Sequence, residues 1–371
     1  MAFSCVPGIA ILLGLTLASD AFAQDASIDK LLNQLPPPEK VLKPRVQSTL
    51  QRQDPAFRDP LGQQAVSAIN KRDFERAMSL SRKLTGRYPH SASAYCLRGS
   101  LACSLRQYRE ATSAFRTAAG IQPHSADAHF GLGLVESAQG HFAAALPHLR
   151  RFAELEPDSF LPYFFLSDCA QSLGRKEESR RYAKKATELA PSFVFTWLLL
   201  ARAEKQLGHT EATLDAVSKA TEVAPDSAAL LALQGYSYIS VNRLPQAIPP
   251  LQRAARLAPQ DYLVQSQLGL CLVTTGQVDA GIAYLRKGAS LAPNYGPVWE
   301  NLGLAYQKKG NHRDAVKALE RATQLLPNQR LTWQHLSEAY RAVGRMQDAQ
   351  RATARAQSLP PGNSKPGSKK A

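Results

Sequence analysis

Apolar residues recur along most of the chain at spacings of three and four, the period of an amphipathic helix. Trp197, Leu200 and Ala201 form one such run, which Leu207 closes just before Gly208. A second run of the same kind follows the glycine and ends close to a proline. Proline ends helices because it lacks the backbone N–H and clashes with the preceding turn. The pattern therefore predicts pairs of helices, each pair joined by a short turn.

These helical pairs repeat with a constant period of 34 residues. The tenth residue after each proline is small, as at Gly133 and Gly269, which lets the partner helix approach closely. Directly after the proline, Asp158-Ser159 and Asp226-Ser227 are expected to cap the next helix. The period is carried by the prolines Pro89, Pro123, Pro157, Pro191, Pro225, Pro259, Pro293, Pro327 and Pro361.

The unit over residues 296–329 is the most complete. It contains Trp299, Leu302-Gly303, Tyr306, Gly310, Ala315, Leu319, Ala322 and Pro327. This spacing resembles the tetratricopeptide repeat, and the resemblance extends over nine units from about Arg58 to Asn363. It implies an all-α fold, a right-handed superhelical solenoid of about nine helix-turn-helix units, with the first and last units atypical. One unit cannot bury its apolar face alone, so stability depends on stacking.

The segments outside the array differ in composition. Residues 1–23 hold an apolar run from Gly8 to Ala18 and end on Ala21-Phe22-Ala23, which predicts a signal peptide. No Lys or Arg precedes the run, so a misassigned start codon or an uncleaved anchor stays open. Residues 24–57 are expected to be a proline-rich leader, and residues 364–371 a basic disordered tail. No later apolar stretch is long enough to span a bilayer.

The chain is basic, with 45 Lys and Arg against 30 Asp and Glu. Such a balance attracts polyanions of many kinds. An exported protein is not expected to meet nucleic acid, so acidic envelope polymers or acidic proteins are the expected anionic partners. The clusters Arg150-Arg151, Arg180-Arg181 and Lys184-Lys185 fall on second helices, on the expected convex side. They are either a solvated face or a polyanion site.

Four cysteines follow the predicted cleavage point, namely Cys96, Cys103, Cys169 and Cys271. Cys96 and Cys103 lie seven residues apart on one predicted helix, which separates their Cα atoms by roughly 10 Å. That distance excludes a disulfide between them. We interpret all four as buried small apolar residues rather than as a disulfide framework.

No motif in the sequence indicates catalysis, a metal or a cofactor. The chain contains no Gly-x-Ser-x-Gly element, no glycine-rich phosphate loop and no Cys-x-x-Cys pair. His124 with His129, and His141 with His148, lack a third ligand at a useful spacing. Because nine units take up nearly all of the mature chain, we expect a protein that is not an enzyme.

The resemblance implies that first helices line the concave side of the array and bind extended peptides or helices. Aromatic anchors on such a surface dominate interface energies, although these phenylalanines could instead pack between helices and complete the core. The expected partner-binding residues are Phe130, Leu134, Phe164, Phe165, Asp168, Phe195, Leu198, Arg202, Tyr236 and Ile239. Nearer the C-terminus the lining turns polar, with Gln267, Glu300, Asn301, Gln307, Lys308, His335, Glu338 and Arg341.

Together these features predict a non-catalytic protein–protein interaction scaffold in the cell envelope, periplasmic or secreted, that binds a partner peptide or helix in its concave groove. Two alternatives stay open. The first is a protein that binds acidic polymers or anionic surfaces through its basic convex face. The second is a cytosolic assembly factor whose start codon is misassigned.

Overall fold

The computed structural model describes residues 54–360, and throughout that range the regular structure is helical. The described chain divides into two compact units, residues 54–223 and 224–360. We call them the N-terminal part and the C-terminal part and describe each by itself. The predicted signal peptide, nearly all of the predicted leader and the predicted tail lie outside the described residues.

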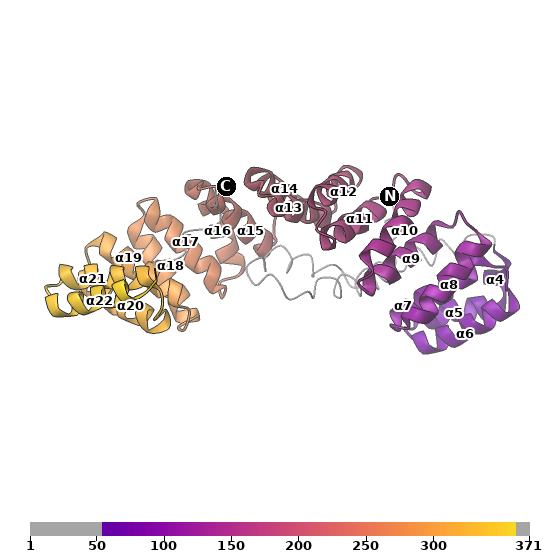
Figure 1. Ribbon diagram of the computed structural model, residues 1–371, viewed down its shortest axis with the longest axis horizontal. Helices are drawn as coiled ribbons and strands as arrows, with labels where there is room; N and C mark the ends of the chain where they lie inside the picture. The colour runs from indigo at the N-terminus through magenta and orange to yellow at the C-terminus, as the bar shows by residue number, and fades with distance from the viewer. Residues whose placement is uncertain (1–53, 361–371) are drawn as a thin grey trace. The chain divides into compact units, whose positions relative to one another are not determined.

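Successive helices form hairpins (Figure 1). In the N-terminal part the hairpins are α5 (Pro60–Asn70) with α6 (Phe74–Arg87), α7 (Ala92–Ser104) with α8 (Tyr108–Ile121), α9 (Ala126–Ala138) with α10 (Phe142–Leu155), α11 (Leu161–Ser172) with α12 (Lys176–Leu189), and α13 (Val194–Leu207) with α14 (Thr210–Val223). In the C-terminal part they are α15 (Ala228–Ser240) with α16 (Leu244–Leu257), α17 (Tyr262–Thr274) with α18 (Val278–Leu291), α19 (Gly296–Lys309) with α20 (His312–Leu325), and α21 (Arg330–Ala342) with α22 (Met346–Ser358). The prediction of an all-α helical repeat solenoid is confirmed.

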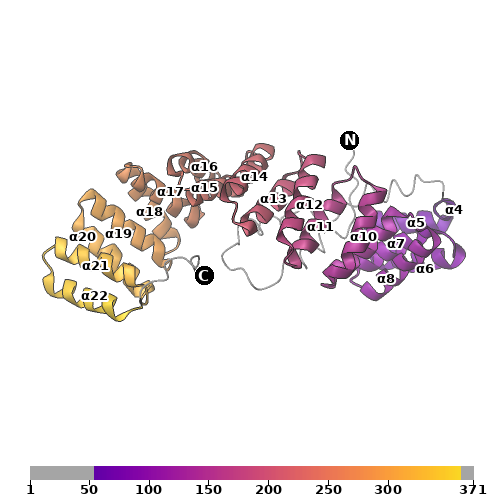
Figure 2. The same cartoon turned by 45° about the horizontal axis from the view of Figure 1, so that its top comes forward.

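Neighbouring hairpins stack within each part (Figure 2). Inside each part, a second helix that is followed by another hairpin packs against its own first helix and against the first helix of that next hairpin, as α12 does with α11 and α13. First helices of neighbouring hairpins also touch, as α9 does with α11 and α17 with α19. Each hairpin therefore buries its apolar face on a neighbour, as a solenoid requires.

The two helices of a hairpin meet where a small residue faces a large one. A Cβ atom added to Gly133 on α9 would lie 2.7 Å from the side chain of Leu149 on α10. Where the second helix carries the smaller Ala183, the first helix carries Ser167, whose hydroxyl donates to the carbonyl of Ser179 at 2.9 Å. The size of the residue predicted to be small, ten positions after each proline, thus depends on the volume of the side chain that it faces on the second helix.

The carbonyl of the repeating proline is a hydrogen-bond acceptor for the side chain six residues later. These bonds join Trp197 Nε1 to Pro191, Trp299 Nε1 to Pro293, Trp333 Nε1 to Pro327 and Gln265 Nε2 to Pro259, at 2.8 to 3.2 Å, and His129 Nε2 lies 3.0 Å from the carbonyl oxygen of Pro123. Trp, Gln and His can share this repeat position because each carries a nitrogen that reaches the same acceptor.

Serine caps begin several first helices, but not all those predicted. Ser227 accepts a hydrogen bond from the N–H of Leu230, three residues later, as expected. The prediction that Asp158-Ser159 caps α11 is wrong. The residue three after Ser159 is Pro162, which has no N–H to donate, and α11 begins only at Leu161 without a side-chain cap.

The folded array starts earlier than predicted. Residues 55–57, assigned to the leader, belong to a short helix, α4 (Pro55–Arg58), which contacts α5 and α7. Asp54 accepts a hydrogen bond from the N–H of Ala56 at 3.0 Å, and proline occupies the first helical position, where its missing donor costs nothing. Phe57 is 7% exposed, so this helix contributes to the core.

All four cysteines in the described residues are buried free thiols, which agrees with their interpretation as core residues. Burial raises the pKa of Cys103 to about 12, and burial likewise raises the pKa of Cys169 to about 12. The Sγ atom of Cys169 lies 3.1 Å from the hydroxyl of Ser137.

Candidate partner-binding surface

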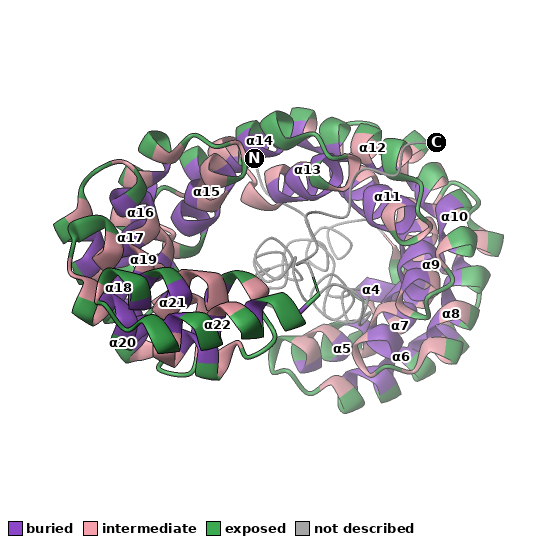
Figure 3. Cartoon of the chain, turned by 60° about the vertical axis from the view of Figure 1, so that its left-hand side comes forward, coloured by how far each residue is buried: buried purple, intermediate pink, exposed green. Residues whose placement is uncertain are grey.

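Most of the predicted binding residues are buried, which contradicts the prediction that their side chains line a groove. The ring of Phe130 lies 4.7 Å from that of Phe152 and 5.5 Å from that of Phe165, so these side chains fill the space between α9, α10 and α11. Figure 3 shows the buried colouring that runs along α9 and α11. A buried ring cannot touch a partner unless the helices separate. The buried members of the predicted site are Phe130, Leu134, Phe164, Phe165, Asp168, Leu198 and Arg202.

Two of these buried residues form an internal ion pair. Arg202 on α13 lies 2.7 Å from the carboxylate of Asp168 on α11, and their side chains are 7% and 9% exposed. The two positions are 34 residues apart, so the pair joins equivalent sites of neighbouring hairpins. A buried charge is tolerated when it is paired. The structure therefore gives Asp168 and Arg202 a role in packing.

The other three predicted residues are only partly buried. Phe195 on α13 packs its ring 5.3 Å from that of Phe193. Tyr236 and Ile239 lie on α15 and pack against the edge of the core of the C-terminal part. Direct contact with a partner stays a prediction for these three residues.

The C-terminal part carries an exposed surface of which the sequence analysis named only the polar members, Gln267 and Asn301. Leu263, Gln267 and Leu270 follow one another on α17 at the i, i+4, i+7 spacing, which places them on one face of the helix. Leu263 is 37% exposed, and the other two are partly exposed.

The same spacing recurs on the neighbouring helices. On α19 it includes Asn301 and Leu304, both partly exposed, and on α21 it begins with Leu331, which is 54% exposed. Because α19 contacts both α17 and α21, these faces adjoin. We call this surface the leucine–amide wall, and it consists of Leu263, Gln267, Leu270, Asn301, Leu304 and Leu331. The leucine spacing was visible in the sequence, but nothing in it indicated exposure.

Polar residues predicted for this lining divide into two groups. Glu300 and His335 lie 3.1 Å apart between α19 and α21, and Lys308 donates to the carbonyl of Val273 on α17 at 2.6 Å. These side chains tie neighbouring first helices together. Gln267 and Asn301 make no hydrogen bond or ion pair within residues 54–360. Their amides keep both donors and acceptors available.

The basic clusters predicted for the convex face are mostly paired with carboxylates. Arg150 lies 2.8 Å from Glu178, and Arg180 lies 3.1 Å from Glu177. Arg151 and Lys185 have similar partners in Glu154 and Glu188. Arg181 and Lys184 alone among the six are without such a partner in the described chain. The positive charge available there is smaller than the sequence suggested.

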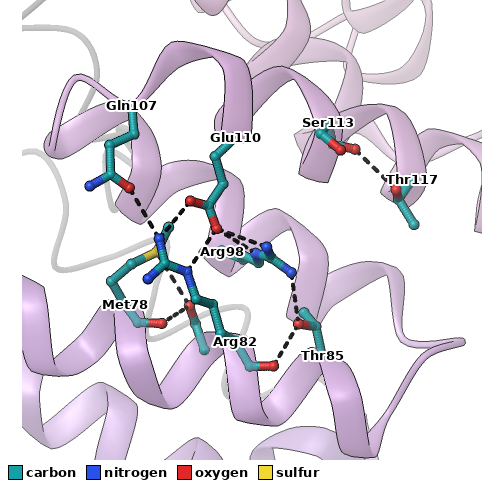
Figure 4. Close-up of polar contacts among 9 residues, drawn as sticks. Met78, Arg82, Thr85, Arg98, Gln107, Glu110, Ser113 and Thr117 are labelled. Carbon is teal, nitrogen blue, oxygen red and sulfur yellow. Dashed lines mark hydrogen bonds and ion pairs between the residues drawn. The ribbon is translucent and has the colours of Figure 1, made fainter.

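The first two hairpins contain a stronger tie of the same kind. Figure 4 shows the carboxylate of Glu110 on α8 between the guanidinium groups of Arg82 on α6 and Arg98 on α7. The ion-pair distances are 2.6 and 2.8 Å. The hydrogen bond from Arg82, helped by that from Arg98, holds the pKa of Glu110 at about 2. Glu110 therefore stays charged at ordinary pH and joins three helices.

A shallow hollow of ≈ 690 Å³ lies at the loop ends of the first two hairpins, with Asp54, Arg87, Tyr88, Ser91 and Gln122 among its lining residues. Its polar groups largely bind each other or neighbouring side chains. The hydroxyl of Ser91 donates to Asp54 at 2.9 Å, and Arg87 donates to a neighbouring carboxylate at 2.7 Å. Across the described part of the chain, no three metal-binding side chains cluster, and no helix has the length and hydropathy to cross a bilayer.

Comparison with known protein families identifies the fold class. One tetratricopeptide repeat model matches residues 96–140, 130–192, 198–262 and 232–295, and a second matches residues 296–329. Together the matches cover more than half of the chain. The chain belongs to the tetratricopeptide repeat family, whose members generally serve as interaction modules.

Similar solved structures include YrrB, described as a tetratricopeptide repeat protein with an unusual peptide-binding site. YrrB is 22% identical over 50% of this chain and 95% of its own, with a TM-score of 0.46. PilW, described as a widely conserved type IV pilus biogenesis factor, is 19% identical over 54% of this chain and 92% of its own, with a TM-score of 0.46. MamA from Desulfovibrio magneticus RS-1 is 21% identical over 46% of this chain and 96% of its own, with a TM-score of 0.43. No curated protein matches the chain.

Proposed function

We propose that this protein is a non-catalytic scaffold that holds a partner protein, as an extended peptide or a helix, on the leucine–amide wall. The observation that carries the proposal is a pair of amides, Gln267 and Asn301, that have no partner among the described residues and lie among partly exposed leucines on adjoining helices. Contiguous exposed apolar surface is typical of interaction sites. An amide offers a donor and an acceptor, which suits the N–H and C=O groups of a peptide backbone.

The wall is tested by crosslinking in intact cells followed by purification of the tagged protein. A variant with Gln267→Ala, Asn301→Ala and Leu270→Ser removes both amides and one central leucine. Partners that bind the wild-type protein should be lost, because both the hydrogen bonds and the apolar contact are gone.

The matched control carries Arg181→Ala and Lys184→Ala on the second helix α12, away from the wall. It should retain the partners, and circular dichroism should show equal helix content in all three proteins. If the wall variant and the control both keep the same partners, the wall is not their binding site.

We also propose that the scaffold works outside the cytoplasm, in the periplasm or after secretion. The apolar run from Gly8 to Ala18, followed by small residues at Ala21 and Ala23, supports this proposal. Mass spectrometry of the protein purified from cell fractions tests it. We expect the mature chain to begin at Gln24. A chain that keeps its first residues and fractionates with the cytosol would favour an assembly factor that stays inside the cell.

A further inference from the structure

Positive charge is concentrated at one end of the N-terminal part. The first two hairpins, residues 58–125, contain eleven Lys and Arg but only four Asp and Glu. The next three hairpins, residues 126–223, contain eleven Lys and Arg and thirteen Asp and Glu. Neighbouring stretches of one stacked array thus differ in the sign of their net charge.

Five of these basic residues lie at or next to the turns that join the two helices of each hairpin. Lys71, Arg72 and Arg76 surround the turn between α5 and α6, and Arg106 and Arg109 surround the turn between α7 and α8. All five are exposed. We call this set the basic turn edge.

The basic turn edge differs from the basic residues packed behind it. Arg82 and Arg98 both pair with the carboxylate of Glu110, which offsets one of their two positive charges (Figure 4). Within residues 54–360, Lys71, Arg76, Arg106 and Arg109 have no ion pair. The charges of these four residues therefore face solvent.

Two of these arginines hold a backbone conformation that suits glycine. Arg72 has φ +60° and Arg106 has φ +57°. At the same turn position, six later hairpins have glycine with φ between +72° and +95°. A side chain in the left-handed region costs free energy that glycine avoids. Keeping arginine at two adjacent turns despite this cost points to a role for the side chains.

We infer that the basic turn edge is a second docking site, which binds an extended acidic segment of a partner protein. Four of its five residues are arginines, whose planar guanidinium groups bind carboxylates with two parallel hydrogen bonds. The charges belong to the turns of two stacked hairpins, which suits an extended segment that passes from one turn to the next. The site lies in the N-terminal part and does not depend on the leucine–amide wall.

Fluorescence anisotropy with the full chain and a labelled peptide of about twelve residues, rich in Glu and Asp, tests this inference. The variant Arg72→Gly with Arg106→Gly removes two charges and relaxes both turns. We expect it to weaken binding by about tenfold or more, because two charge-assisted contacts are lost. The control Arg181→Gln with Lys184→Gln removes the same charge from α12 and should change the affinity by less than about twofold.

Several outcomes would overturn the inference. Equal binding by wild type and the arginine variant would do so, as would an equal loss in the control, which would indicate attraction by net charge alone. Tighter binding to vesicles of anionic phospholipid than to the peptide would make the occupant a membrane surface. Loss of peptide binding in the Gln267→Ala, Asn301→Ala variant would mean that the acidic segment binds the leucine–amide wall. That result would overturn this inference but agree with the proposed function.

Folding of the variants is checked by thermal melts. We expect the two glycine substitutions to raise the melting temperature by a few degrees, since the strained turns relax. A second variant, Arg72→Asn with Arg106→Asn, keeps the test sound if the glycine variant folds poorly, because Asn242 already occupies the same turn position with φ +58°. It should lose peptide binding to a similar extent.

Discussion

The N-terminal and C-terminal parts are built from the same repeat but differ at one position of the first helix, the seventh residue after the repeating proline. In the N-terminal part, large apolar side chains at this position fill the space between neighbouring helices and close it to solvent. In the C-terminal part, small or polar side chains leave the adjacent leucines partly exposed. The residues are Phe130, Phe164 and Leu198 in the third to fifth hairpins of the N-terminal part, whose second hairpin has the smaller Cys96, and Ala232, Ser266, Glu300 and Gln334 in the C-terminal part. The same backbone pattern thus yields either a closed core or an open surface, depending on the size and polarity of the side chain at one position.

The two parts also differ in what ties neighbouring hairpins together. The N-terminal part uses phenylalanines packed in tilted or edge-on pairs together with carboxylate–arginine pairs, of which Asp168 with Arg202 is the most buried. In the C-terminal part, arginines of second helices donate to the proline carbonyls that close the preceding hairpin. These are Arg253 to Pro225, Arg321 to Pro293 and Arg355 to Pro327, at 2.9 to 3.4 Å. The carboxylate–arginine pairs are therefore more sensitive to pH than the hydrogen bonds from arginine to the proline carbonyls.

The largest expected effect comes from Phe130→Ala. Phe130 is 1% exposed and contacts two other rings, so the substitution should reduce the free energy of unfolding by about 3 to 5 kcal/mol. Gln334→Ala is the matched control at the same repeat position of the C-terminal part, where the side chain is partly exposed, and should cost less than about 1 kcal/mol. Urea unfolding followed by circular dichroism measures both. Equal losses of unfolding free energy in the two variants would contradict the distinction between a closed core in the N-terminal part and an open surface in the C-terminal part.

Arg202→Ala should cost about 3 kcal/mol, because it leaves the carboxylate of Asp168 buried without its partner. Arg150→Ala breaks an exposed pair with Glu178 and should cost less than about 1 kcal/mol. The double variant Asp168→Leu with Arg202→Met should recover most of the lost stability in the same urea titration. A double variant as unstable as Arg202→Ala would mean that the pair itself, and not its burial, stabilises the hairpins.

Gly281→Ala examines the close contact between α17 and α18 in the C-terminal part. A Cβ atom at this position would lie 2.5 Å from the side chain of Val273 and 2.7 Å from the carbonyl oxygen of Gly269. We expect a loss of about 1 to 3 kcal/mol from overpacking. Gly120→Ala on α8 meets no atom within 4 Å and should instead stabilise its helix by up to about 1 kcal/mol. If thermal melts show that both substitutions change the melting temperature in the same direction, the close contact at Gly281 is contradicted.

Glu110 gives the N-terminal part a defined dependence on pH. Its pKa lies at about 2 in the folded protein because of its arginine partners, below the ordinary value of 4.5. The stabilisation is therefore complete above the ordinary pKa and is lost as pH falls through the folded pKa. Glu110→Gln should cost about 1 kcal/mol at pH 7, after allowance for partial exposure, and almost nothing near pH 2. Urea titrations of both proteins across this range would refute the role of Glu110 if the difference did not shrink.

The smallest expected effect has the opposite sign. Arg72→Gly should stabilise the protein by about 0.5 to 1 kcal/mol, because glycine adopts the left-handed turn without strain. Arg76→Gly, one turn further along and inside α6, should destabilise it by about 1 kcal/mol. Differential scanning calorimetry measures whether each substitution raises or lowers the stability. If both variants are destabilised, the turn at Arg72 is not strained, and the argument for its side-chain role weakens.

Features that depend on residues within one repeat could be predicted from the sequence. The period of the prolines, the small residues such as Gly133 and the capping Ser227 all act through neighbours in the same hairpin or at its junction. The prediction for Ser159 was wrong for an equally local reason, since Pro162 has no N–H to be capped. The folded segment at Phe57 was missed because its burial depends on helices that come later in the chain.

The sequence by itself determined the helices, their pairing and the class of protein, because a 34-residue period of apolar and small residues can bury its surface in few other ways. The tertiary structure decided which first-helix residues are available to a partner. Exposure at Leu270 or Phe130 depends on side-chain volumes contributed by neighbouring helices, and the Asp168 to Arg202 contact joins residues one full repeat apart. Packing across repeats is a property of several side chains together, so no single position in the sequence reveals it.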